Sequence, residues 1–183
     1  LLLFTDTGRV FRKRVFELPL ARRDGPGKAL VNFLELRDGE RVLEMVPYNE
    51  DQVDEASHIV TVTARGYIKR TQLSEFANMR KTGLIAVVID EDDRLIAVRF
   101  TDGKQHIIMS SGDGMSIRFD ENEVRPMGRQ ARGVRGMGLR LSNEIAPDMY
   151  NYGHFQVLFL VFTNRNIFSP VQNNIGSLQN RIG

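Results

Sequence analysis

An internal repeat is the feature of this 183-residue chain that most limits its fold. An apolar run, a hydroxyl residue, two turn residues and a glycine precede a second apolar run at three places, around Gly8, Gly66 and Gly114. This pattern is typical of a β-hairpin whose glycine adopts the left-handed conformation that closes a short loop. The three glycines are roughly 50 residues apart, which is the length of a small β-unit rather than of a whole domain.

Other positions recur in phase with the hairpins. A basic residue, a glutamate and a second glycine follow each hairpin glycine at nearly constant distances: Arg12, Arg70 and Arg118; Glu17, Glu75 and Glu123; Gly27, Gly83 and Gly133. A strand-like run follows the second glycine, as at 29–34 and 84–89, and acidic turns at 38–40 and 90–93 lead into another. Four strands in about 50 residues predict an all-β, propeller-like fold of four-stranded antiparallel blades. The alternative is a β-sandwich, but chance similarity would not produce the shared phase.

The repeat also predicts how the chain is divided. Three blades are expected over residues 1–142, with units near 1–40, 41–90 and 91–142. Residues 143–183 are poor in charge and rich in asparagine, and they contain one echo of the pattern, in which Asn166 takes the place of the turn glycine. We expect a degenerate fourth blade or a divergent tail there. The start at Leu1, inside a strand-like run, leads us to expect no signal peptide and a longer parent chain.

Composition excludes several kinds of chemistry. The chain has no cysteine, so disulfides, thiolate metal sites and cysteine nucleophiles are absent, which agrees with a reducing compartment. No apolar run approaches the ~20 residues of a membrane-spanning helix. The sequence has no G-x-S-x-G, Walker or H-E-x-x-H motif, and we predict no catalytic residue and no metal site. The acidic run 90–93 could attract Mg²⁺ but is better interpreted as a solvated turn, and the glutamate series as a repeated cap or ion pair.

The basic residues give the functional hypothesis. In a propeller, equivalent positions of successive blades lie side by side, so clusters that recur once per unit would join into a positive stripe despite a net charge of only +2. Lysines and arginines in such a stripe contact phosphates without regard to base sequence, and a curved stripe favours bent duplex. The candidate DNA-binding residues are Arg12, Arg22, Arg23, Lys28, Lys69, Arg70, Arg80, Lys81, Arg118, Arg129, Arg132 and Arg135. Solubilising surface charge, a protein-interaction propeller with an acidic partner, and a propeller enzyme are the alternatives.

Four segments resemble a known family. The chain resembles the C-terminal domain of the DNA gyrase A protein in the order, spacing and amino-acid sequence of four segments, 2–12, 27–36, 71–76 and 123–139. The resemblance covers residues 1–142. It implies a six-bladed β-pinwheel of a type IIA topoisomerase that wraps double-stranded DNA around its basic rim. The implied partners are the remainder of the A subunit, together with the B subunit, in an A2B2 assembly without a membrane. ATP and Mg²⁺ are implied for that holoenzyme alone, with no cofactor in this chain, and the implied location is a bacterial cytoplasm and nucleoid, or a plastid.

The sequence departs from the family at one motif. The heptapeptide Q-R-R-G-G-K-G marks the first blade in gyrase, whereas residues 21–27 read A-R-R-D-G-P-G here and the adjoining 27–36 resembles the second blade. The heptapeptide is therefore expected upstream of Leu1. Without it, the A-type subunit of topoisomerase IV stays the alternative parent. The catalytic tyrosine and metal-binding cluster belong to other parts of the enzyme and are assigned to no residue here.

Overall fold

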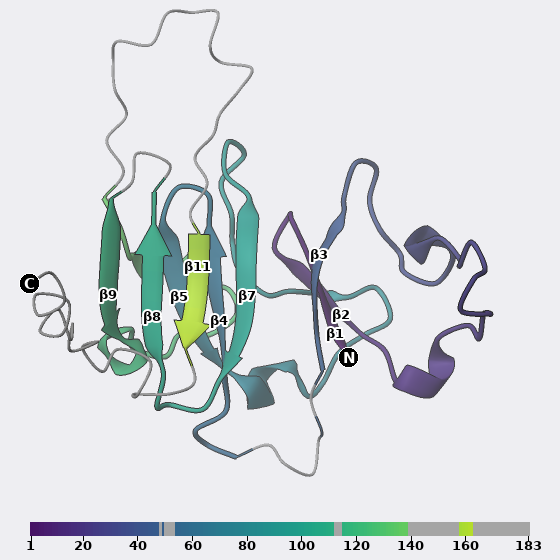
Figure 1. Cartoon of the computed structure of the whole chain (residues 1–183), viewed down its shortest axis with the longest axis horizontal. Helices are drawn as coiled ribbons and strands as arrows, with labels where there is room; N and C mark the ends of the chain where they lie inside the picture. Colours follow the sequence, from purple (N-terminus) through teal and green to yellow (C-terminus); the bar gives the residue numbers. More distant parts are fainter. Residues whose placement is uncertain (48, 50–53, 112–114, 139–157, 163–183) are drawn as a thin grey trace, which may run out of the picture.

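The protein forms three antiparallel β-sheets that stand side by side (Figure 1). This computed structural model describes residues 1–47, 49, 54–111 and 115–138, together with the backbone of 158–162. Within that part of the chain the strands are connected by turns and short 3-10 helices, with no α-helix. The predicted all-β fold of antiparallel blades is confirmed. No helix among the described residues has the length and apolarity to cross a membrane.

The first sheet has the strand order β3-β1-β2-β6. Its strands are β1 (Leu2–Thr5), β2 (Arg9–Arg12), β3 (Val42–Val46) and β6 (Leu84–Ile85). The hairpin β1–β2 turns at Gly8, whose φ of +80° lies in the left-handed region that favours glycine. A Cβ at this position would also lie 2.5 Å from the Val87 carbonyl oxygen, so both the turn and the close backbone contact require glycine.

The second and third sheets repeat this plan. The second has the order β10-β5-β4-β7, formed by β4 (His58–Thr63), β5 (Tyr67–Gln72), β7 (Leu95–Thr101) and β10 (Val134–Arg135). The third has the order β11-β8-β9, formed by β8 (His106–Ser110), β9 (Ser116–Asp120) and β11 (Leu158–Phe162). The predicted hairpins β4–β5 and β8–β9 are both present, although the turn 112–114 lies outside the described residues.

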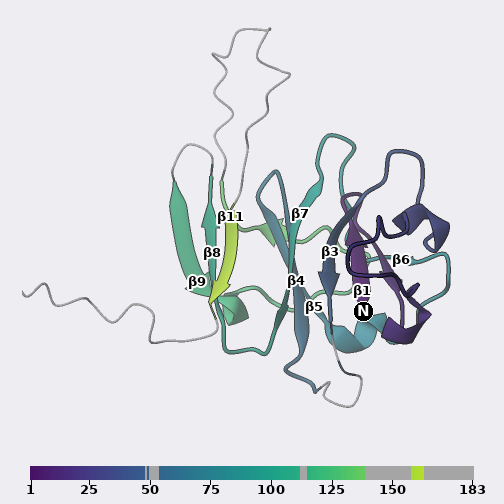
Figure 2. The ribbon, with the colours of Figure 1, turned by 45° about the vertical axis from the view of Figure 1, so that its right-hand side comes forward.

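Each of the first two sheets takes its edge strand from the following repeat. Figure 2 labels the first of these strands, β6, near β1. Strand β6 comes after β5 in the chain but pairs with β2, and β10 comes after β9 but pairs with β5. The four strands of a sheet are therefore not consecutive, whereas the repeat predicted all four within one unit. The second glycine of each repeat allows this pairing, because a residue without a side chain can approach the preceding hairpin closely. A Cβ at Gly83 would lie 2.9 Å from the Val10 carbonyl oxygen, and one at Gly133 would lie 2.5 Å from that of Ile68.

Two other expectations change in the structure. The run 29–34, predicted as a strand, contains the 3-10 helix η2 (Leu30–Asn32). Strand β11 pairs with β8, which is the position that β3 and β7 hold in the first two sheets. It therefore belongs to the third sheet. The other residues of the predicted fourth unit, Asn166 included, lie outside the described part of the chain.

The core lies between neighbouring sheets. Strand β4 is buried along its whole length, and its side chains alternate between two hydrophobic clusters. Ile59 joins Phe4 and Phe76 between the first and second sheets, whereas Val60 joins Ile107 in the cluster shared with the third. The rings of Phe4 and Phe76 meet edge to face with centroids 6.0 Å apart. The sheets therefore stabilise one another through repeated apolar contacts between adjacent repeats.

Candidate nucleic-acid interface

Three loops carry half of the predicted DNA-binding residues. Each loop runs from the 3-10 helix that follows a hairpin to the second glycine of its repeat, over residues 18–26, 77–82 and 125–132. We call them the basic loops. The second loop leads into β6 and the third into β10, which are the edge strands of the first and second sheets. The backbone therefore presents these two loops at equivalent edges of successive sheets.

The basic side chains of the loops and of the residues just after them are mostly open to solvent. Arg22, Arg23, Lys28, Arg80, Lys81 and Arg135 are exposed, and Arg129 and Arg132 are partly buried. Arg22 lies 3.4 Å from Asp24, in an ion pair whose two side chains are largely in water. Such exposed pairs contribute little to stability, so these side chains can exchange one anionic partner for another at small cost.

Arg129 and Arg132 of the third basic loop have protein partners. Arg129 Nε is 3.6 Å from Glu75 Oε2, and Arg132 Nη2 is 2.5 Å from Asp90 Oδ2. The Arg132 guanidinium also lies 3.9 Å from the centre of the Tyr67 ring, an arrangement in which the ring attracts the cation. These contacts hold the two side chains in defined positions. They also offset part of their positive charge. The repeat predicted a cap or an ion pair for Glu75, whereas the contact of Arg132 with Asp90 was not foreseen.

The cations on the hairpins have a different role, since they bind the backbone of the next repeat. Arg12 Nη1 donates to the Ala77 carbonyl oxygen at 2.8 Å, at the start of the second basic loop. Arg9 Nη2 donates to the Thr82 carbonyl oxygen at 2.5 Å, at the end of the same loop. Arg9 was not among the predicted site residues. In the sequence it lies beside the turn glycine and is one of four basic residues on the first hairpin, with Arg12, Lys13 and Arg14.

Arg9 is oriented by a buried carboxylate. Glu40 accepts hydrogen bonds from Arg9 Nη1 at 2.6 Å, from the Thr7 hydroxyl at 2.7 Å and from the Arg37 backbone N–H at 2.8 Å. Burial by itself would raise the pKa of Glu40. The hydrogen bonds from Arg37, Thr5 and Thr7, together with the charge of Arg9, outweigh burial and lower the pKa of Glu40 below its ordinary value.

Lys69 is buried and cannot contact DNA, which corrects the prediction. Its side chain lies between two repeats, and Nζ donates to the Ala86 carbonyl oxygen at 2.7 Å and to the Arg129 carbonyl oxygen at 2.5 Å. Burial, and to a smaller extent the nearby Arg129 charge, lowers the pKa of Lys69 to about 8, although Glu75 opposes this shift. Lys69 therefore anchors the third basic loop by binding the backbone carbonyl of Arg129.

Arg70 is also buried, so its predicted role as a phosphate contact is corrected in the same way. Its Nη1 donates to Asn122 Oδ1 at 2.7 Å and lies 3.7 Å from the buried Glu121 carboxylate. Its carbonyl oxygen accepts the Met127 N–H at 2.8 Å. Arg118, the equivalent residue on β9, is exposed. The predicted set therefore contains two buried members, and the other ten reach the surface fully or in part.

The recurring glutamates act as caps and as an ion-pair partner, as the repeat predicted. Glu17 accepts the N–H of Arg14, the residue that precedes the 3-10 helix η1 (Val15–Glu17). Glu123 accepts the Asp120 N–H in the same way in η5 (Glu121–Glu123). Glu75, in η4 (Leu73–Phe76), pairs with Arg129 instead. The shared position therefore fixes the segment that leads into each basic loop.

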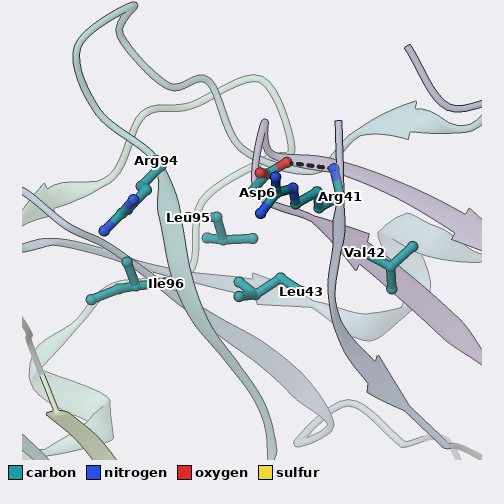
Figure 3. Close-up of a pocket in the computed structure, with 7 residues that line it drawn as sticks. All are labelled: Asp6, Arg41, Val42, Leu43, Arg94, Leu95 and Ile96. Atoms are coloured by element: carbon teal, nitrogen blue, oxygen red, sulfur yellow. Dashed lines mark hydrogen bonds between the residues drawn. The ribbon is translucent and has the colours of Figure 1, made fainter. Parts of the chain in front are cut away.

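A surface hollow of about 350 Å³ separates β3 from β7 (Figure 3). Arg41 and Arg94 stand at equivalent positions on its rim, Asp6 Oδ1 accepts the Arg41 backbone N–H at 3.0 Å, and the floor is formed by apolar side chains of the two strands. The described residues bring together no group of three or more His, Asp or Glu side chains suited to a metal ion.

Comparison with known proteins gives the family. The profile of the family described as "DNA gyrase C-terminal domain, beta-propeller" matches residues 1–49, 57–102 and 105–144. The DNA gyrase A protein of Haloquadratum walsbyi is 43% identical over 148 residues, and that of Haemophilus influenzae is 40% identical over 151 residues. These matches cover 80% and 81% of this chain but only 17% of each relative, so the chain spans about one sixth of their length.

Solved structures show the same fold. A crystal structure of the C-terminal domain of DNA topoisomerase IV superimposes with a TM-score of 0.75 at 27% identity, over 89% of this chain and 47% of that one. A structure of the DNA gyrase A C-terminal domain superimposes with a TM-score of 0.61 at 21% identity, over 77% of this chain and 44% of the other. Together with the profile match over most of the sequence, these similarities show that the chain belongs to the DNA gyrase C-terminal domain family of β-propellers.

Proposed function

We propose that this chain is a DNA-binding and DNA-wrapping part of a type IIA topoisomerase of the gyrase A type, and that it contacts the duplex through phosphates. The observation that carries the proposal is the separation of the cations into two groups. The loop cations Arg80 and Lys81 are exposed next to an edge strand, while Arg9 and Arg12 of the preceding hairpin bind the backbone of that loop. The exposed charges of Arg80 and Lys81 are therefore carried by a loop whose backbone is held at both ends by Arg9 and Arg12.

Phosphate contact explains how such loops would bind DNA without reading its sequence. Each lysine or arginine that neutralises a phosphate releases counterions, so affinity falls steeply as salt rises. The proposed contacts are the basic-loop cations Arg22, Arg23, Arg80, Lys81, Arg129 and Arg132, with Lys28 and Arg135 just after the loops, Arg118 on β9 and the partly buried Arg12. Because the loops recur at the edges of sheets that stand side by side, a duplex that follows them would bend, and the added contacts would offset the bending energy.

The anchoring hydrogen bonds would make these contacts more favourable. A loop that is free to move loses conformational entropy when it binds, and a loop that is already ordered loses less. Lys69 orders the third basic loop through the Arg129 carbonyl oxygen, and Arg9 orders the second through that of Thr82. We therefore assign Arg9 and Lys69 to positioning and the loop cations to DNA contact.

The proposal extends to the whole enzyme by family membership. The remainder of the A subunit, the B subunit, ATP and Mg²⁺ would complete an A2B2 holoenzyme that supercoils DNA in a bacterial cytoplasm and nucleoid, or in a plastid. Gyrase is favoured over topoisomerase IV because the curated relatives that match at 39–43% identity are gyrase A proteins.

The test is binding of a duplex of random sequence by this chain. The double variant Arg80→Ala/Lys81→Ala should weaken binding to all sequences alike, because it removes two phosphate contacts. A double variant Arg94→Ala/Lys104→Ala removes the same charge from exposed sites outside the basic loops and serves as the control. Equal losses in the two double variants would show that net charge matters and the loops do not. Retention on an acidic protein but not on DNA would favour a protein-interaction propeller.

A further inference from the structure

One cation of the third basic loop is paired with an acid at the protein surface. Arg132 Nη2 lies 2.5 Å from Asp90 Oδ2, and the two side chains are 38% and 39% exposed. Asp90 comes after strand β6 and begins the acidic turn 90–93, in which the Asp93 N–H donates to the Asp90 carbonyl oxygen at 3.0 Å. The surface that we assign to DNA contact therefore contains a carboxylate next to one of its cations.

The backbone on both sides of the contact brings this pair together. The Val88 N–H donates to the Ala131 carbonyl oxygen at 3.4 Å. Lys69 joins the same two segments slightly earlier in each, through the two carbonyl oxygens described above. The pair of Asp90 and Arg132 continues this series of contacts, so its two members are placed by the fold and do not meet only through the flexibility of long side chains.

Tyr67, at the start of the second strand of the second hairpin, is another partner of Arg132. The guanidinium carbon of Arg132 lies 3.9 Å from the centre of the Tyr67 ring, and that of Arg135 lies 5.7 Å from it. An aromatic ring attracts a guanidinium group through its face and does not occupy the N–H donors. Tyr67 can therefore hold Arg132 in place while one anionic partner of the guanidinium is exchanged for another.

The ion pair of the first repeat, by contrast, is closed to solvent. Arg9 Nη1 lies 2.6 Å from Glu40 Oε2, and the two side chains are only 11% and 0% exposed. Separating a pair of this kind would leave an uncompensated buried charge, so the pair stays together. The pair of Asp90 and Arg132 is open to water, and such exposed pairs contribute little to stability. It can be exchanged, whereas the pair of Arg9 and Glu40 is fixed.

A phosphate is a suitable replacement for the carboxylate of Asp90. Both groups are anions that accept hydrogen bonds from the planar fork of a guanidinium group, so they compete for the same donors of Arg132. We propose that Asp90 is an internal competitor of DNA, which occupies the phosphate position at Arg132 in the free protein and is displaced when a duplex reaches the third basic loop. Tyr67 is the positioning residue that keeps Arg132 in place in both states. The inference rests on the proposed function, because it takes DNA as the competing anion.

The competition should be visible in the salt dependence of DNA binding. A phosphate that binds Arg132 releases counterions, but the displaced carboxylate of Asp90 takes up a cation and offsets this release. Arg132 should therefore add little to the salt dependence of the wild type. Removing the carboxylate should restore its full contribution.

The experiment measures binding of a duplex of random sequence to the 183-residue chain and its variants over a range of salt concentrations. Asp90→Asn should bind about two- to fivefold more tightly than the wild type, with a slope of log affinity against log salt that is steeper by about 0.9. Glu91→Gln is the matched control, because it removes the same charge from the next residue, which is exposed and has no ion pair within the described part of the chain. Equal gains in the two variants would overturn the inference.

Arg132→Ala tests whether Asp90 acts through Arg132. In that background Asp90→Asn should gain no more affinity than Glu91→Gln does, because the cation for which the carboxylate competes is gone. A gain as large as in the wild-type background would show that Asp90 acts by general repulsion of DNA and would overturn the inference.

Arg80→Ala/Lys81→Ala separates a failure of this inference from a failure of the proposed function. If the double variant weakens binding while Asp90→Asn behaves like its control, the basic loops bind DNA and the competition is refuted. If binding is unchanged in both, the proposed function and the inference are wrong together.

The positioning role of Tyr67 is tested in the Asp90→Asn background, where the carboxylate no longer holds Arg132. Tyr67→Phe keeps the ring and should bind DNA as tightly as the background protein. Tyr67→Leu removes the ring and should bind several-fold more weakly with the salt slope unchanged, because the contact is less well ordered but is not lost. Equal affinities of the two variants, or a shallower slope for Tyr67→Leu, would contradict the role assigned to Tyr67.

Discussion

Lys69 Nζ donates a hydrogen bond to the Arg129 carbonyl oxygen at a distance of 2.5 Å, from a side chain that is 1% exposed. One cation of the protein is thus buried to hold the loop on which another is presented. Arg12 has the same relationship to Ala77 in the preceding repeat, although it is less buried. The two contacts connect three repeats through backbone carbonyl groups. Every residue has such a group, so the contacts do not depend on the side chain of the accepting residue.

Lys69 should make the free energy of unfolding depend on pH in the alkaline range. Its pKa is about 8 in the folded protein against 10.5 ordinarily, so between these values the unfolded chain binds more protons than the folded chain. Stability therefore rises as pH increases from 8 to 10.5, by about 3 kcal/mol from this group. Urea unfolding of the wild type and of Lys69→Met across that range would measure the difference. Lys81→Met, at an exposed site, should parallel the wild type, and parallel curves for all three proteins would refute the assignment.

Glu40 should have the opposite behaviour in acid. Its pKa is lowered in the folded protein, so its contribution is fully present above the ordinary pKa of 4.5 and is lost as pH falls through the folded value. Glu40→Gln should be destabilised by about 1–3 kcal/mol at neutral pH, because Arg9 loses its buried anionic partner. Thermal melts should show this difference shrinking in acid, whereas Glu35→Gln, at an exposed position, should follow the wild type. A deficit that does not change with pH would exclude titration of Glu40 as its source.

Phe76 should be a major source of contact energy between the first two sheets. It is 1% exposed and lies against Phe4, so Phe76→Ala should cost about 3–5 kcal/mol through lost burial and the cavity that remains. Phe100, which is 42% exposed on β7, provides the comparison, and Phe100→Ala should cost less than half as much. Similar losses in chemical denaturation would show that the inter-sheet cluster does not dominate stability.

The hairpins could be predicted from the sequence because they are local. Gly8 and Gly66 each lie between two apolar runs and have a positive φ. A turn of this kind is determined by neighbouring residues, so it can be recognised without knowing the long-range contacts. The caps at Glu17 and Glu123 are equally local, since each carboxylate binds an N–H three residues earlier. Recurrence in three units made both predictions secure.

The exchange of edge strands could not be predicted from the same pattern. The spacing of the glycines is identical whether β6 pairs with its own hairpin or with the preceding one, because a repeat specifies phase and not hydrogen-bond partners. The burial of Lys69 and Arg70 was hidden for a related reason. Their partners are carbonyl groups and side chains of the next repeat. Lysines and arginines that look alike in the sequence can therefore be buried anchors at one position and exposed cations at another.

The division between anchors and contacts is tested most directly by the salt dependence of DNA binding. The slope of log affinity against log salt should decrease in magnitude by about 0.9 for each phosphate contact removed. For Arg80→Ala/Lys81→Ala we predict a slope that is shallower by about 1.8 than the wild type, since two contacts are lost. For Lys69→Met we predict weaker binding with the slope unchanged, because the residue positions a loop without touching a phosphate. A slope that decreases for Lys69→Met, or stays constant for Arg80→Ala/Lys81→Ala, would contradict this account.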